Sequence, residues 1–225
     1  MPLTKSKGNM YSWVSHTWNP IKGCQFECDY CYVKHAVDKY GYDARVRLDE
    51  EDLRTRLGRD KIVFVGSMAD MWGEWVPKEQ IAKILWRCRD FPHNEYVFQS
   101  KNPRRFLEFK FWKDLRVVLG TTIETDEYPA SFHTNAPSID ERIQAMLNLK
   151  PMKRFVTIEP IMDFQIDSLV AAIRAVDPDF VTIGADSKWH GLVEPPWEKV
   201  ELLISELNKF VEIRQKKNLN RLRNK

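Results

Sequence analysis

Three cysteines lie close together in the stretch "IKGCQFECDYCYVKHA". Cys24 and Cys28 are separated by three residues, and Cys28 and Cys31 by two, while Cys88 is the only other cysteine in the 225 residues. Cysteines this close in sequence can form a disulfide, bind a structural zinc, provide a catalytic nucleophile or hold an iron–sulfur cluster.

The count of three thiols separates these alternatives. Neighbouring cysteines would close only very short disulfide loops, and the N-terminal residues contain no apolar secretory stretch, which predicts a reducing, cytoplasmic location. A structural zinc needs four ligands, and His35 could complete the set, although all four would fall within twelve residues. One catalytic thiol does not account for three. An iron–sulfur cluster held by three thiolates accounts for the count and leaves one iron open to a ligand.

The rest of the chain alternates between two patterns. The runs "KIVFVGS", "EYVFQSK", "RVVLGTTIE", "RFVTIEP" and "FVTIGAD" are continuous and apolar, as is typical of parallel strands covered on both faces. A sixth strand is expected in "YSWVSHTW". Helical patterns follow Pro77, the Ser138–Glu141 capping box and Pro196, and Leu169, Ile173 and Val176 share a helical stripe after the run "RFVTIEP". This alternation predicts an α/β fold with right-handed crossovers, arranged as a partial (βα)6 barrel.

Polar residues follow every predicted strand. They are Ser67, Asp70, Ser100, Lys101, Thr122, Glu124, Glu159 and Asp186. A polar residue at the end of one strand is expected, because strand ends are exposed to water. Polar residues at the ends of five parallel strands favour a ligand site at the carboxyl edge of the sheet. The irregular stretch 125–137 is a candidate active-site loop.

The net charge of +3 is unevenly distributed. Residues 211–225 carry +5, which leaves −2 for residues 1–210. The basic residues of this segment are Arg214, Lys216, Lys217, Arg221, Arg223 and Lys225. We therefore predict a barrel domain over 1–210 and a basic tail over 211–225, which is either solvated or in contact with nucleic acid. No run of 18 apolar residues is present, so no membrane span is expected.

The cysteine spacing, with the aromatic Tyr30 before the last cysteine, resembles the signature of the radical S-adenosylmethionine (SAM) superfamily. The stretches "HTWNPIKGC", "VFVGSMADMWGEWVP", "FQSKNPRR", "TIEPIMDF" and "VTIGADS" resemble a phage- and archaea-associated radical SAM family and, more distantly, the spore photoproduct lyase group. The resemblance implies a [4Fe-4S] cluster on Cys24, Cys28 and Cys31 with SAM on the open iron. It also implies reductive cleavage of SAM to a 5′-deoxyadenosyl radical that abstracts hydrogen from an unknown substrate, with flavodoxin or ferredoxin as an external electron donor.

The same resemblance implies which residues contact SAM. They are Tyr30, Tyr32, Ser67, Asp70, Lys101, Thr122, Glu124, Glu159 and Gly184. Ser67 and Asp70 fall where the family binds the methionyl amine, although Gly66–Asp70 departs from the usual Gly-Gly-Glu. Lys101 resembles the lysine that pairs with the SAM carboxylate. Thr122 and Glu124 fall at the ribose. The adenine is expected near Tyr30, Tyr32 and Gly184.

Other residues invite weaker interpretations. Cys88 lies on the apolar stripe of a predicted helix, and we expect it in the core. Trp72 and Trp75 could form the wall of a substrate pocket by stacking on a ring. The substrate is unknown, and the two classes left open are a nucleotide or nucleic acid and a small molecule or peptide. The alternative function is a nucleic-acid-binding module that a zinc on the three cysteines and His35, or an inert cluster, stabilises without catalysis.

Overall fold

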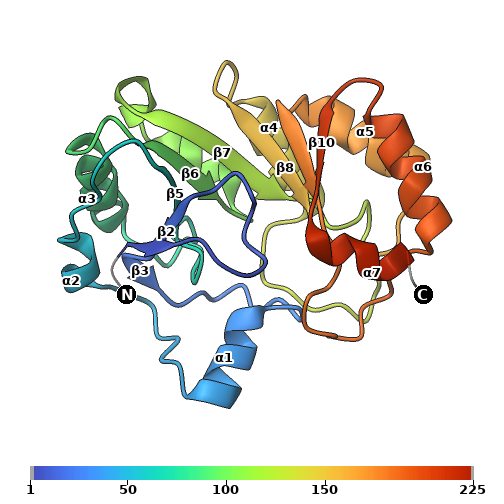
Figure 1. Ribbon diagram of the computed structural model, residues 1–225, viewed down its shortest axis with the longest axis horizontal. Helices are drawn as coiled ribbons and strands as arrows, with labels where there is room; N and C mark the ends of the chain where they lie inside the picture. The colour runs from blue at the N-terminus through green and yellow to red at the C-terminus, as the bar shows by residue number, and fades with distance from the viewer. Residues whose placement is uncertain (1–2, 224–225) are drawn as a thin grey trace.

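The structure is a computed structural model that describes residues 3–223, except for the side chains of His35, Asp38, Phe111 and Trp112. Its centre is an eight-stranded sheet in the order β1-β2-β5-β6-β7-β8-β9-β10 (Figure 1). The strands are β1 Thr4–Lys5, β2 His16–Trp18, β5 Ile62–Val65, β6 Glu95–Gln99, β7 Arg116–Thr122, β8 Arg154–Ile158, β9 Phe180–Ile183 and β10 Glu212–Gln215.

Neighbouring strands from β2 to β10 are parallel, and β1 is antiparallel to β2. The six predicted strands are confirmed as β2 and β5 to β9, because continuous apolar runs suit strands that are buried on both faces. The α/β class with a mostly parallel sheet is therefore confirmed. The partial-barrel form of that sheet remains a prediction.

The helices alternate with these strands. They are α1 Tyr32–Tyr40, α2 Glu50–Leu53, α3 Lys78–Arg89, α4 Ile139–Leu147, α5 Ile166–Val176, α6 Trp197–Leu207 and α7 Asn220–Arg223, with 3-10 turns η1 Pro103–Glu108, η2 Phe111–Asp114 and η3 Lys217–Leu219. A separate two-stranded sheet pairs β3 (Ile21–Lys22) with β4 (Arg47–Leu48). The predicted capping box begins α4, where the Ser138 hydroxyl accepts a hydrogen bond from the Glu141 amide. Among the described residues, no helix has the length and apolar character to cross a membrane.

The two faces of the sheet are covered differently. Helices α3 to α6 lie around the outside of the sheet in Figure 1, and their apolar faces form the main core, in which Cys88 is fully buried as expected. On the other face, Tyr11 and Trp13 from the segment before β2 pack on Phe155 and Phe180. Further along the strands this inner face becomes polar. The apolar layer thus closes one end of the inner face and leaves a polar rim at the other.

The C-terminal segment is part of the sheet. Strand β10 pairs with β9 from Glu212 opposite Phe180 to Gln215 opposite Ile183, and Leu219 and Leu222 after it are buried. The expectation of a solvated tail is therefore wrong for residues 212–223, because apolar residues between the charges anchor the segment. The boundary at residue 210 falls just before a strand of the same sheet, and Lys225 lies outside the described residues.

Candidate functional site

The cysteine loop lies between β3 and α1, at the edge where the parallel strands end. Gly23 begins the loop with a φ of +76°, and a Cβ there would lie 2.3 Å from the carbonyl oxygen of Ala44, so only glycine fits. Gly23 also forms a parallel bridge with Ala69 in the turn after β5. The loop is thereby fixed to the carboxyl end of the sheet.

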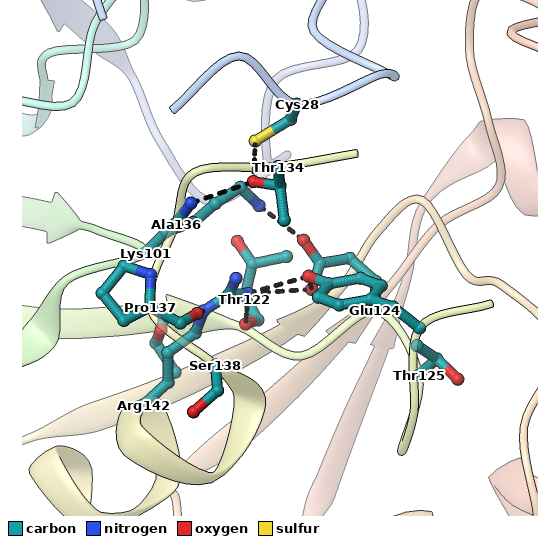
Figure 2. Close-up of polar contacts among 12 residues, drawn as sticks. Cys28, Lys101, Thr122, Glu124, Thr125, Thr134, Ala136, Pro137, Ser138 and Arg142 are labelled. Atoms are coloured by element: carbon teal, nitrogen blue, oxygen red, sulfur yellow. Dashed lines mark hydrogen bonds and ion pairs between the residues drawn. The ribbon is translucent and has the colours of Figure 1, made fainter. Parts of the chain in front are cut away.

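The stretch 125–137 packs against the cysteine loop, which places this predicted active-site loop at the candidate site. The Asn135 amide donates to the carbonyl of Phe26 at 2.7 Å, and the His133 amide donates to the Asp29 carboxylate at 2.7 Å. The Cys28 sulfur lies 3.1 Å from the Thr134 hydroxyl (Figure 2). Residues far apart in sequence thus determine the shape of the cysteine loop.

Burial acts on two thiols of the loop, Cys24 and Cys28. Burial, followed by the nearby Asp70 and the other two cysteines, raises the pKa of Cys24 to about 12. Burial also raises the pKa of Cys28, and the positive charge of Lys101 opposes that rise. Without a bound group, Cys24 and Cys28 are therefore protonated at neutral pH, and binding a metal would require them to release protons.

The cysteine loop offers three thiols as donors for a metal group. Among the side chains that the structure describes, which exclude those of His35 and Asp38, no three from His, Cys, Asp or Glu are grouped to hold one metal ion. An iron–sulfur cluster takes one thiolate per iron, so its ligands need not converge on one point. Three thiols on one short loop, two of them partly exposed, fit this requirement. The side chain of His35 lies outside the described residues, so the zinc alternative stays untested.

Glu124 is the centre of a buried charge network beside the cysteine loop. Its side chain is fully buried and accepts from Lys101 Nζ at 2.5 Å and from Arg142 Nη1 at 3.0 Å (Figure 2). The hydroxyl of Tyr128 donates to the same carboxylate at 2.6 Å, and that of Tyr30 donates as well. Two cations therefore share one carboxylate, which leaves the network with an excess positive charge.

Lys101 is the residue of this network whose positive charge acts on the cysteine loop, at the Cys28 thiol. Burial, together with the positive charge of Arg142, lowers its pKa to about 8 despite the pairing with Glu124. Its backbone amide donates to Asp70 at 2.9 Å, and the same carboxylate accepts from the Ser100 hydroxyl at 2.8 Å and the Trp72 amide at 3.0 Å. Asp70 thus holds the turn that carries Lys101.

A second polar cluster forms at the ends of β8 and β9. The Glu159 carboxylate accepts from Lys216 at 2.6 Å, from Asn9 at 2.8 Å and from Asn218 at 3.0 Å. A Cβ at Gly184 would lie only 2.7 Å from Oε1 of Glu159, so glycine is needed for this carboxylate to occupy its position. The predicted contacts Glu159 and Gly184 are therefore neighbours.

The remaining predicted contacts lie around the first group. The hydroxyl of Tyr32 donates to the carbonyl of Ser67, whose own hydroxyl donates to Asn19 at 3.1 Å. The Thr122 hydroxyl accepts from Gln99 at 2.9 Å on the inner face. The structure thus brings the predicted residues to one edge of the sheet, in two clusters. Their contacts with SAM remain predictions.

The pocket-wall interpretation of the two tryptophans is wrong for Trp72. Its side chain is fully buried among aromatic rings, with the Phe106 centroid at 4.7 Å, so it belongs to the core. Trp75 is half-buried and packs edge-on against Phe26 at 4.7 Å. Trp75 therefore supports the cysteine loop.

The sequence interpretation missed several residues of the site. Arg142 could have been found, because it is a charged residue on the apolar stripe of α4 that includes Ile143 and Met146. Lys216 was predicted only as part of a basic tail, and Asn9 and Asn218 gave no signal, because they lie in segments without a recognisable motif.

Comparisons with known proteins give one family match. A family profile described as "protein of unknown function" (DUF5131) matches residues 9–199. The chain belongs to this family. A search of curated proteins found no match.

Solved structures of spore photoproduct lyase are similar to this chain. A double mutant with bound AdoMet and dinucleoside spore photoproduct has a TM-score of 0.60 at 14% identity, covering 91% of this chain and 64% of that one. A cysteine-to-serine mutant has a TM-score of 0.67 at 13% identity, covering 94% and 79%. A cysteine-to-alanine mutant has a TM-score of 0.66 at 12% identity, covering 94% and 80%. The chain spans less than two thirds of the first of these, and at such identities the likeness establishes the fold.

Proposed function

We propose that this protein is a radical SAM enzyme, in which Cys24, Cys28 and Cys31 hold a [4Fe-4S] cluster and SAM binds at the open iron. The observation that carries the proposal is the position of the three-cysteine loop. It lies at the carboxyl edge of a sheet whose fold is that of spore photoproduct lyase, of which one structure holds AdoMet. When bound, the cluster supplies the electron that cleaves SAM, leaving a 5′-deoxyadenosyl radical.

The residues around the loop suit this ligand. The excess positive charge of the Glu124 network suits the SAM carboxylate, and Lys101 is the member best placed to donate to it. Tyr30 stacks on Phe132 at 5.7 Å, and Phe132 stacks on Tyr128 at 4.5 Å, so an aromatic layer covers the network and limits the access of water. Thr122 and Glu124 would then hold the ribose, and Gly184, beside Glu159, would lie against the adenine.

The substrate and the electron donor extend the proposal. A nucleotide or nucleic acid is the proposed substrate class, since one spore photoproduct lyase structure contains a dinucleoside photoproduct. Cys88 is fully buried in the core, so its thiol cannot reach a substrate at the rim. The photoproduct-repair reaction is therefore not carried over. The electron donor is an external protein such as flavodoxin or ferredoxin.

Anaerobic reconstitution with iron and sulfide tests the proposal. The wild type should become brown, with broad absorbance near about 400 nm, and after reduction it should release methionine and 5′-deoxyadenosine from SAM. Cys24→Ala should lose both properties, whereas the matched control Cys88→Ala should keep them. Methylthioadenosine as the product, or iron loss in Cys88→Ala, would contradict the proposal. A colourless protein with one bound zinc would support the binding module instead.

A further inference from the structure

Thr134 brings a hydroxyl group to the sulfur of Cys28. The two atoms lie 3.1 Å apart, within the distance of a hydrogen bond to sulfur (Figure 2). Cys28 is buried, whereas Cys24 and Cys31 are partly exposed. A hydrogen bond at Cys28 is therefore shielded from water, which would otherwise compete for the same sulfur.

The residues on both sides of Thr134 are bonded to the cysteine loop. Before it, the carbonyl of His133 accepts from the Asp29 amide at 3.2 Å, and the amide of His133 donates to the Asp29 carboxylate at 2.7 Å. After it, the Asn135 amide donates to the carbonyl of Phe26 at 2.7 Å. These bonds hold the Thr134 backbone in place independently of its own side chain.

The surroundings of the Thr134 hydroxyl decide which atom donates when a cluster is bound. The hydroxyl accepts from the Ala136 amide at 3.1 Å and has one proton to donate, either to the carbonyl of Phe26 at 3.2 Å or to the Cys28 sulfur. A Cys28 thiolate on iron has no proton, so it can only accept. The carbonyl of Phe26 keeps its bond from Asn135 when the hydroxyl turns to the sulfur. The hydroxyl can therefore donate to the thiolate without leaving this carbonyl unpaired.

We propose that Thr134 donates a hydrogen bond to the Cys28 thiolate and thereby raises the reduction potential of the cluster. The inference rests on the proposed function, because it requires the cluster. Hydrogen bonds to the sulfurs are among the factors that set the potential of an iron–sulfur cluster. Reduction adds negative charge to the cluster and its thiolates, and a hydrogen bond to a more negative acceptor is stronger. The Thr134 hydroxyl thus stabilises the reduced form relative to the oxidised form.

A redox titration of the reconstituted full-length protein, without SAM, tests this inference. Thr134→Val keeps the shape of the side chain and removes the hydroxyl. It should lower the equilibrium constant for one-electron reduction about tenfold, which is a shift of about 59 mV to lower potential. Thr134→Ser keeps the hydroxyl and should restore the wild-type potential. Thr134→Ala removes the hydroxyl with a smaller side chain and should show the same shift as Thr134→Val, so it serves as the test where valine blocks cluster assembly.

The control is Asn135→Ala, which loosens the same loop without removing a group that contacts sulfur. The Asn135 side chain donates to the carbonyl of Gln25 at 3.4 Å and to the Glu27 carboxylate at 3.2 Å. This variant should keep the wild-type potential. An equal shift in Asn135→Ala would show that the position of the loop sets the potential, and would overturn the inference. A wild-type potential in Thr134→Val or Thr134→Ala would overturn it as well.

The outcomes separate this inference from the proposed function. A protein that cleaves SAM and whose cluster potential is independent of Thr134 would refute the inference and leave the function standing. A cluster whose potential depends on Thr134, in a protein that releases no 5′-deoxyadenosine, would refute only the enzyme. A wild-type protein that binds no cluster would refute both.

Discussion

The charge balance around Glu124 predicts opposite results for two substitutions at neighbouring positions. Glu124→Gln removes the one carboxylate that lies within 3.0 Å of both Lys101 and Arg142, and leaves only the more distant charge of Asp70 beside Lys101. Removing one partner of a buried ion pair costs about 3–5 kcal/mol. Glu124→Gln should therefore lower the free energy of unfolding by that amount.

Lys101→Met leaves a balanced pair of one carboxylate and one guanidinium. Burial already lowers the pKa of Lys101 to about 8 from its ordinary 10.5, so its charged form is disfavoured at this position. A shift of that size corresponds to at most about 3.4 kcal/mol, and replacing a buried ion by an apolar side chain is often neutral or stabilising. Lys101→Met should consequently be as stable as the wild type at pH 7, or more stable.

Urea unfolding of the cluster-free protein measures both values, provided that the slope m is unchanged. The control is Glu127→Gln, an exposed carboxylate in the same loop, which should change stability by less than about 0.5 kcal/mol. The double variant Glu124→Gln with Lys101→Met should be less destabilised than Glu124→Gln alone. Equal losses for the two single variants would refute the excess-charge argument.

Three further predictions follow from the same contacts. Between pH 8 and 10.5 the unfolded chain binds more protons at Lys101 than the folded chain does. Raising the pH through this range should therefore increase the free energy of unfolding of the wild type relative to that of Lys101→Met. Below pH 8 the difference between the two free energies should be constant. Gly184→Ala should lower the free energy of unfolding in urea by about 1–3 kcal/mol, because the added Cβ must displace the Glu159 carboxylate. A Gly184→Ala variant as stable as the wild type would show that this carboxylate moves freely. Calorimetry should show that Asp70→Asn weakens SAM binding by about 1.5–3 kcal/mol through the position of Lys101, and unchanged affinity would disprove that link.

The sequence predicted the strands well because each of them is buried on both faces. Strand β10 was not predicted, because it lies at the edge of the sheet and carries the charged residues Glu212 and Arg214. The guanidinium of Arg214 lies 3.6 Å from the Phe180 centroid, so a basic side chain does the packing that an apolar residue does elsewhere. A charged edge strand and a solvated tail look alike in sequence.

The site was predicted as a set of residues, and the structure adds which of them act on one another. The carboxyl-end rule placed Glu124 and Lys101 at one edge correctly. It could not show that Asp70 is engaged by backbone amides, because hydrogen bonds to the main chain leave no trace in residue type.

The Glu159 cluster has a consequence for biosynthesis. Its carboxylate is bound by Asn9 from near the start of the sequence and by Lys216 and Asn218 from near residue 223. A chain emerging from the ribosome can form strands β5 to β8 while this cluster still lacks its last two donors. Contacts of such long sequence separation form late in folding. A nascent chain that stalls before residue 216 therefore carries the cysteine loop and most of the sheet but an incomplete second half of the site.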